Sequence, residues 1–195
     1  MSELGPLSVI DTGRGLSVIY NGRHLYSSRD PQAAPLAAVR RASHIPSTLY
    51  LIPSPCLCYG LAQLLAKLDA SSAILCVDTD PVLHALAQKT ASALGLEHPR
   101  LVFVESTDPW QVLQRARHTL SWKRVELLVL GAGYTLDRAF YDSLCALLQA
   151  DAARSLRNRI SLARMGRLWT KNLFSNLGRM DWNRVSPSRL ASSSL

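Results

Sequence analysis

The turn Ser54–Gly60 is the first candidate binding site, because it joins a short apolar segment to an amphipathic one. Nucleotide-binding folds place their phosphate or cofactor loop at such a junction. Asp78 follows Gly60 by 18 residues, close to the offset of about 20 residues at which a carboxylate accepts hydrogen bonds from ribose hydroxyls. Glu105 ends the next apolar segment, where it is placed to face an adenine or a nucleophile. The candidate cofactor-binding residues are Ser54, Cys58, Tyr59, Gly60, Asp78 and Glu105.

The composition of this turn disfavours a bound diphosphate. The turn contains one glycine, whereas phosphate loops use several, because a missing Cβ lets the backbone approach the ligand. Cys56 and Leu57 bring side chains into this space, and Pro55 lacks a backbone N–H. An adenosyl or amino-acid ligand needs fewer loop amides. S-adenosylmethionine and a nucleotide sugar are the cofactors to consider, and the alternative is a degenerate loop that binds neither.

Other signatures of catalysis or metal binding are missing from the sequence. It contains no P-loop, no nucleophile elbow and no metalloprotease motif. The five histidines show no ligand spacing, and we expect His84 and Tyr141 to lie on helix surfaces. Cys56 and Cys58 form a C-x-C without a second pair, whereas a structural zinc site needs four ligands. We therefore expect reduced thiols, and we predict no catalytic residue and no metal site.

The elements that position the candidate residues follow from an alternation of patterns between residues 46 and 150. The apolar segments are nearly continuous runs such as LYLI and AILCV, which is typical of parallel strands covered on both faces. Strands that alternate with helices predict βαβ units. Right-handed crossovers then predict a doubly wound, Rossmann-like sheet of the methyltransferase type. The predicted strands are 48–52, 73–77, 101–104 and 125–130, and the predicted helices are 59–68, 81–94, 110–120 and 136–150.

Ligands of doubly wound folds bind outside the carboxyl ends of the strands. The turn Ser54–Gly60, Asp78 and the loop Gly131–Tyr134 all follow predicted strands, so we expect them to meet at this edge. Asp80 and Asp108 each precede a proline at a predicted helix start. An aspartate followed by proline is typical of a helix N-cap, so we expect these two carboxylates to cap helices.

Residues 7–28 predict a small antiparallel β element ahead of the sheet. Asn21-Gly22 is the strongest short hairpin signal in the chain, because these two residue types accept positive φ. Asp30-Pro31 marks a helix start, and we expect that helix to continue to about Ser43.

Composition and charge restrict the class of protein. Of the 195 residues, 48% are hydrophobic and 18% charged, which is enough apolar material for a packed core. The net charge of +8 lies wholly in residues 154–195, which hold nine basic and one acidic residue, whereas residues 1–153 hold 13 of each. A neutral body argues against nucleic-acid binding. The N-terminus has no basic, apolar leader, so we expect a cytoplasmic protein.

Residues 151–182 predict a basic amphipathic helix. We expect Arg154–Met180 to dock against a partner protein or a missing catalytic domain, and contact with a membrane surface is a weaker alternative. The Ser-rich residues 183–195 predict a disordered tail. The predicted division is 1–45, 46–150, 151–182 and 183–195. The apolar face comprises Leu162, Met165, Trp169, Leu173, Leu177 and Met180, opposite Arg154, Arg157, Arg164, Arg167 and Lys171.

Several of these segments resemble a known bacterial family. His24–Pro31 resembles the LHS-x-x-DP motif of the motility-associated-factor flagellin glycosyltransferase-like proteins, which are also described as similar to 6-hydroxymethylpterin diphosphokinases. Leu51–Leu65 falls where that family has a G-x-G-L-G-Y loop. Asn158–Leu162 and Met165–Asn172 resemble the segment that follows the N-terminal domain in spirochaete-type members. The resemblance extends over residues 12–178.

The resemblance implies a Rossmann-like N-terminal domain that precedes a central sugar-transfer domain, and this chain is expected to be the N-terminal domain alone. It departs from the family in the lost glycines of the loop and in Gln32–Pro35, which lacks the acidic residue that follows the DP motif. We therefore expect an accessory, non-catalytic module. The alternatives are an S-adenosylmethionine-dependent methyltransferase and a nucleotide-sugar-binding glycosyltransferase domain.

Overall fold

The computed structural model describes residues 7–177. They fall into two units, of which the first ends at Arg154 and the second begins at Ser155. The predicted disordered tail, residues 183–195, and Met180 of the predicted C-terminal helix lie outside the described residues.

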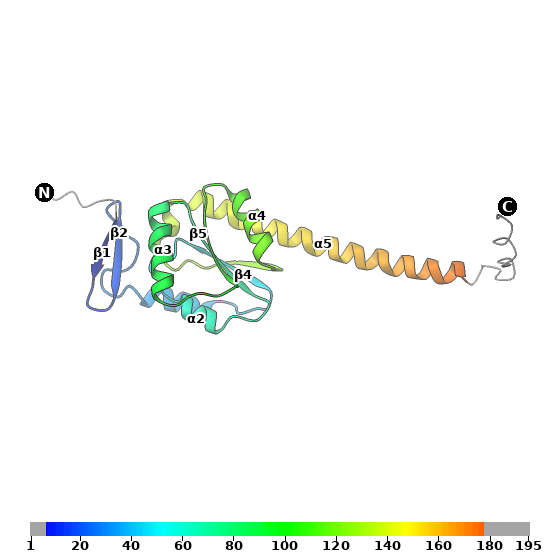
Figure 1. The fold of residues 1–195 in the computed structure, drawn as a ribbon, viewed down its shortest axis with the longest axis horizontal. Helices are drawn as coiled ribbons and strands as arrows, with labels where there is room; N and C mark the ends of the chain where they lie inside the picture. The colour runs from blue at the N-terminus through cyan, green and yellow to red at the C-terminus, as the bar shows by residue number, and fades with distance from the viewer. Residues whose placement is uncertain (1–6, 178–195) are drawn as a thin grey trace, which may run out of the picture. The chain divides into compact units, whose positions relative to one another are not determined.

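The N-terminal element is a three-stranded antiparallel sheet of β1 (Leu7–Asp11), β2 (Leu16–Tyr20) and β3 (Arg23–His24). The β2–β3 turn holds Asn21 at a φ of 47° and Gly22 at a φ of 75°. Two consecutive positive φ angles are what a tight two-residue hairpin requires. The predicted N-terminal β element is therefore confirmed (Figure 1).

The second sheet confirms the predicted doubly wound, Rossmann-like fold. Its four parallel strands are β4 (Thr48–Pro53), β5 (Ala73–Asp78), β6 (Leu101–Glu105) and β7 (Arg124–Leu127), in the order β6-β5-β4-β7. Every residue of β4 and β5 is buried, which explains their continuous apolar runs. The chain moves from β4 outward to β6 and then crosses to the other side of β4. The switch point of the topology therefore lies between β4 and β7.

Two layers of helices cover the sheet. One face packs against α4 and the first part of α5, through residues such as Leu113 and Leu144. The other face packs against α1, α2 and α3, through residues such as Val39, Leu64 and Ala91. The helices are α1 (Ala33–Arg41), α2 (Leu61–Ala66), α3 (Pro81–Ala93), α4 (Pro109–Thr119) and α5 (Arg138–Leu177), and a 3₁₀ turn, η1 (Ala132–Leu136), precedes α5.

The predicted helix caps are present. Asp80 Oδ1 accepts a hydrogen bond from Val82 N at 2.8 Å, and Asp108 Oδ1 accepts one from Trp110 N at 2.9 Å. Both α1 and α2 are shorter than predicted. Asp30 Oδ1 accepts from Ala33 N at 3.0 Å, so an aspartate-stabilised turn precedes α1 and delays its first residue. Helix α2 begins only after Gly60, because the preceding turn is non-helical.

Helix α5 is one continuous helix of 40 residues rather than two segments. Its buried side chains extend from Phe140 to Ala152 and belong to the first unit. From Ser155 to Asn176 every side chain is exposed. No helix among residues 7–177 combines the length and apolar character that a membrane span needs.

Candidate functional site

The turn after β4 has the backbone shape of a glycine-rich loop without its glycines. Ser54, Cys56, Cys58 and Gly60 all have positive φ, at 37°, 42°, 56° and 85°. A non-glycine residue in this region costs about 1–2 kcal/mol, because its Cβ approaches the following carbonyl oxygen. Three such residues persist here because the surrounding packing holds them. The single glycine, Gly60, also lets the chain pass close to Val39, whose Cγ2 lies 2.9 Å from where a Cβ would stand.

Three backbone amides of the turn, those of Ser54, Leu57 and Cys58, are hydrogen-bonded within the chain. The Tyr26 hydroxyl donates a hydrogen bond to Pro55 O at 2.5 Å and accepts one from Leu57 N at 3.3 Å. Tyr26 is 5% exposed, and Cys56 and Leu57 pack in the same apolar cluster. In a cofactor site these backbone groups face the ligand. Here a tyrosine of the N-terminal segment uses them instead.

A second tyrosine ties the N-terminal strands to the turn. The Tyr59 hydroxyl donates to Leu16 O at 2.8 Å and accepts from Leu16 N at 2.9 Å. Its ring meets the ring of Tyr26 edge to face, with centroids 5.4 Å apart. The Tyr20 hydroxyl, from β2, donates to Asp80 at the start of α3. The N-terminal element therefore covers the carboxyl ends of β4 and β5.

The two thiols of the turn are inert groups of the interior. Burial raises the pKa of the Cys58 thiol to about 12 and raises that of Cys56 as well. Thiolates, not thiols, act as nucleophiles and metal ligands. No cluster of three or more metal-ligating side chains occurs among residues 7–177.

Asp78 ends β5 and is completely buried, at 0% exposure. Its Oδ2 lies 3.3 Å from His84 Nδ1, and its Oδ1 has no hydrogen-bond partner. Burial raises the pKa of this carboxyl to about 6, although the neighbouring Ser54 hydroxyl and His84 partly oppose the shift. The structure thus holds the predicted ribose-binding acid at the expected strand end, but inside the protein. One carboxylate oxygen remains without a partner, which is costly in a buried position.

The expectation that His84 and Tyr141 lie on helix surfaces is wrong. Tyr141 is 0% exposed, and its hydroxyl lies 3.0 Å from Ser54 Oγ and donates to Val77 O at 3.3 Å. The signal for Tyr141 was available, because it shares a helical face with Leu144, Cys145 and Leu148, which are all buried. His84 is one turn into α3 and points back to Asp78.

The remaining predicted residue, Glu105, does not join this group. It pairs in register with Asp78 across β5 and β6, but its side chain is exposed. Ser54, Cys58 and Gly60 are buried and Tyr59 is partly exposed. The structure therefore gathers Ser54, Asp78, His84 and Tyr141 into a buried polar cluster, and it leaves Glu105 at the surface.

The loop after β7 closes the crevice at the switch point. Ala132 N donates to Leu25 O at 2.7 Å, which joins this loop to the N-terminal segment. A Cβ on Gly131 would lie 3.0 Å from the ring of Tyr26, and a Cβ on Gly133 would lie 2.5 Å from Cβ of Ser54. Only glycine permits these contacts, so the loop seals the space between β4 and β7 that doubly wound folds leave for ligands.

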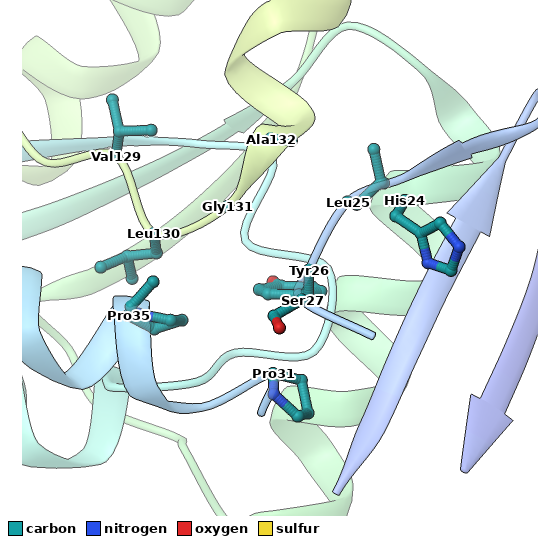
Figure 2. A pocket seen from close by; sticks show the side chains of 11 residues that line it. His24, Leu25, Tyr26, Ser27, Pro31, Pro35, Val129, Leu130, Gly131 and Ala132 are labelled. Carbon is teal, nitrogen blue, oxygen red and sulfur yellow. The ribbon is translucent and has the colours of Figure 1, made fainter. Parts of the chain in front are cut away.

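One open pocket lies beside this sealed crevice, with a volume of about 440 Å³ (Figure 2). It is formed where the segment His24–Ser27, the start of α1 and the loop after β7 meet. Most of its lining is apolar, and His24 and Ser27 are its polar side chains. Its size is within the range of small-molecule sites. The lining residues are His24, Leu25, Tyr26, Ser27, Pro31, Ala34, Pro35, Val129, Leu130, Gly131 and Ala132.

Comparisons with known proteins found a relative of this chain. No protein-family model matches it. A protein of Treponema pallidum (strain Nichols), described as an uncharacterized protein, is 31% identical over 173 residues, which cover 88% of this chain. The chain spans 30% of the length of that relative.

Two solved structures are weakly similar. The spermidine synthase from Thermotoga maritima matches with a TM-score of 0.40 and 13% identity, over 59% of this chain and 42% of that one. A spermidine synthase in complex with the transition state analogue AdoDATO matches with a TM-score of 0.43 and 10% identity, over 72% of this chain and 50% of that one.

Proposed function

We propose that this chain is an accessory Rossmann-like module that binds a partner protein and does not itself carry a cofactor reaction. The supporting observation is the Tyr26 hydroxyl, which occupies the Pro55 carbonyl and the Leu57 amide of the turn. Phosphate and cofactor loops depend on free backbone amides. The Ser54, Leu57 and Cys58 amides of the turn are already hydrogen-bonded within the chain, and Cys56, Leu57 and the Tyr26 ring fill its interior.

The test is isothermal titration calorimetry with S-adenosylmethionine and, separately, with a nucleotide sugar. We expect no binding of either compound to the folded protein at concentrations up to about 1 mM, where even a Kd in the millimolar range begins to show. Micromolar binding that disappears in Asp78→Ala would overturn the proposal. The exposed acid Glu97 provides the matched control, because Glu97→Ala changes one carboxylate far from the turn in sequence and leaves the buried cluster intact.

A second candidate is an S-adenosylmethionine-dependent methyltransferase, and Asp78 favours it. Its Oδ1 lacks a partner in the interior, which suits an oxygen that receives a ribose hydroxyl once the covering strands move away. The positive φ angles of Ser54, Cys56 and Cys58 give the turn the backbone shape of a cofactor loop. In this candidate the tyrosine contacts of the N-terminal element are broken on binding.

Hydrogen exchange distinguishes the second candidate from the first. S-adenosylmethionine binding at Asp78 requires faster amide exchange in Leu16–Tyr26, because this segment must leave the turn, and slower exchange in Ser54–Gly60. An unchanged exchange pattern in both segments with saturating S-adenosylmethionine removes the methyltransferase candidate. The same experiment with a nucleotide sugar tests the glycosyltransferase alternative.

The open pocket bears on the nucleotide-sugar alternative. Its lining contains no lysine and no arginine, whereas proteins that bind phosphate groups use basic side chains or helix N-termini to balance the charge. The pocket therefore lacks the lysine or arginine that commonly holds a diphosphate, and the start of α1 is the helix N-terminus beside it. The relationship to the flagellin glycosyltransferase-like family stays a hypothesis, and in it this chain corresponds to the N-terminal domain.

A further inference from the structure

The second half of α5, Ser155–Leu177, carries large apolar side chains that no described residue covers. Eight of them are 47–68% exposed. Isolated exposed apolar residues are normal, but a helix with this many in 23 residues marks an interaction surface. The eight residues are Leu156, Ile160, Leu162, Met165, Leu168, Trp169, Leu173 and Phe174.

Seven of the eight apolar residues lie in two strips on different sides of the helix, and Leu168 lies between the strips. Successive residues of an α-helix are turned by about 100° around its axis. One strip, called the second-face strip, therefore consists of Leu162, Met165, Trp169 and Leu173. Leu156, Ile160 and Phe174 form another, the first-face strip, which lies about 150° around the helix. A bilayer covers one side of a surface helix and leaves the other in water. Two strips so far apart therefore need a partner on both sides, which only a protein surface provides.

The charged side chains of Ser155–Leu177 restrict which partner surface can bind this helix. Ser155–Leu177 contains four arginines and one lysine and no acidic residue. Arg157, Arg164 and Lys171 lie together beside the first-face strip at helical spacing. Two copies of this helix would bring these like charges together, which is unfavourable. The partner surface must therefore be apolar in two places and acidic beside them.

The Treponema relative indicates where such a surface is found. Its alignment covers 88% of this chain, so a contiguous alignment includes most of Ser155–Leu177. The aligned region is 30% of the relative, which leaves a large remainder of polypeptide attached to the same region. A helix of 23 residues is about 35 Å long, which suffices for an interface of ordinary size.

We infer that Ser155–Leu177 inserts between acidic, apolar surfaces of a protein domain of the kind that forms the remainder of the Treponema relative, and is covered there on two sides. This inference rests on the proposed function, because it names the partner that the accessory module binds. It does not depend on whether the turn binds a cofactor, so the two proposals fail in different experiments.

The test titrates the purified remainder of the Treponema relative into this chain. We expect a Kd in the micromolar range or tighter, at least tenfold weaker in 0.5 M NaCl because the charges are screened. Leu162→Ser with Leu173→Ser, and separately Ile160→Ser with Phe174→Ser, should each weaken binding at least tenfold. Thr170→Ala is the matched control, because Thr170 is exposed and lies between the two strips on the same helix, and it should bind as the unaltered chain does.

A chimera provides a second test if the remainder of the Treponema relative does not fold by itself. In it this chain replaces the aligned region of the full-length relative, and trypsin cleavage after Arg157, Arg164 and Lys171 is measured. We expect slow cleavage in the chimera and rapid cleavage in the chain by itself. Equal cleavage in both, together with no binding in the titration, overturns the inference.

Three further outcomes also contradict the inference. Binding to phosphatidylserine vesicles without binding to the remainder would show that the helix is a membrane contact. A dimer in sedimentation that the second-face substitutions abolish would show that a second copy covers the helix. Loss of binding on substitution of only one strip would contradict the two-sided insertion.

Discussion

Asp78 shows how one buried residue determines the chemistry of its surroundings. Its carboxyl is inaccessible to solvent, and only one of its two oxygens has a partner, His84. The raised pKa means that the carboxyl keeps its proton up to about pH 6 in the folded protein, whereas an ordinary aspartate loses it near pH 4. A carboxyl that exists partly as the neutral acid is poorly suited to hold the positively charged end of a ligand.

The raised pKa of Asp78 predicts a pH dependence of stability. The pKa is about 6 in the folded state and about 3.9 in an unfolded chain. The contribution of the protonated acid is therefore complete below pH about 4 and is lost as the pH rises through about 6. Asp78→Asn removes this loss, so we expect the variant to be more stable than the unaltered protein at pH 8, by about 1–3 kcal/mol. Urea denaturation at pH 8 and pH 4 measures it.

At pH 4 the difference between Asp78→Asn and the unaltered protein should largely disappear. Glu97→Gln serves as the control, because its side chain is exposed and should give the same stability as the unaltered protein at both values. The prediction is contradicted if Asp78→Asn is less stable than the unaltered protein at pH 8 and the deficit is smaller at pH 4. That result would show that the fold needs the ionised carboxylate.

The Tyr26 hydroxyl is predicted to hold the turn in place. In Tyr26→Phe the buried Leu57 amide loses its partner, whereas the Pro55 carbonyl keeps the hydrogen bond from Cys58 N at 2.8 Å. An unsatisfied buried polar group costs about 1–3 kcal/mol. Denaturant unfolding should show a loss of that size. Tyr134→Phe removes a hydroxyl that bonds an exposed carboxylate, Asp142, so its effect should stay below about 0.5 kcal/mol. Equal effects in the two variants would contradict the role given to Tyr26.

Glycine is required by close packing in the loop after β7, but it is not required in the exposed half of helix α5. Gly133 is buried against Ser54 at the switch point, where a Cβ would meet Ser54 Cβ at 2.5 Å. Gly166 lies in the exposed half of α5, and no atom lies within 4 Å of where its Cβ would stand. Close packing makes glycine necessary in the first element, whereas in the second it only lowers helix stability.

The two glycines form a matched pair of substitutions. Gly133→Ala should destabilise the first unit by about 1–3 kcal/mol, because the added methyl group forces the loop away from β4. Gly166→Ala should leave that unit unchanged and raise the helix content of α5, by up to about 1 kcal/mol of helix stability. Thermal unfolding followed by near-ultraviolet circular dichroism measures the stability of the first unit in Gly133→Ala. Far-ultraviolet ellipticity measures the helix content in Gly166→Ala. If Gly133→Ala unfolds at the same temperature as the unaltered protein, the crevice is not sealed as described.

The strands and the capped helices were predictable from the sequence, because local patterns determine them. Continuous apolar runs identify β4 and β5, and Asp80 before Pro81 marks the start of α3. The contents of the candidate site were less accessible. The Tyr26 hydroxyl reaches Pro55 across 29 residues of sequence, and no local pattern shows that a hairpin will supply it. The surroundings of Asp78 are also non-local, since Ser54 comes from the turn after β4 and Tyr141 from α5.

As a whole molecule, the chain joins a packed α/β unit to a helical segment, Ser155–Leu177, that contributes nothing to the core of that unit. The buried side chains of α5 end at Ala152, and the first unit ends two residues later. The side chains from Ser155 to Asn176 are exposed to solvent. The first unit should therefore fold without the second.

Removing residues 155–195 tests this independence. We expect the shortened chain to unfold within about 2 °C of the full chain, because every side chain from Ser155 to Asn176 is exposed. The helix signal in the far-ultraviolet spectrum should fall, since about half of α5 is removed. A drop in Tm of more than about 5 °C, corresponding to roughly 1 kcal/mol, would show that the removed segment supports the first unit.

The filled turn also has a consequence for how the protein responds to its surroundings. A compound that binds only the native state stabilises it in proportion to its concentration. In the proposed function, Cys56, Leu57 and the Tyr26 ring fill the interior of the turn, and the folded population of the protein should then not follow the supply of any nucleotide or methyl donor. A low or a high supply of these compounds would then leave the amount of folded protein in the cell unchanged.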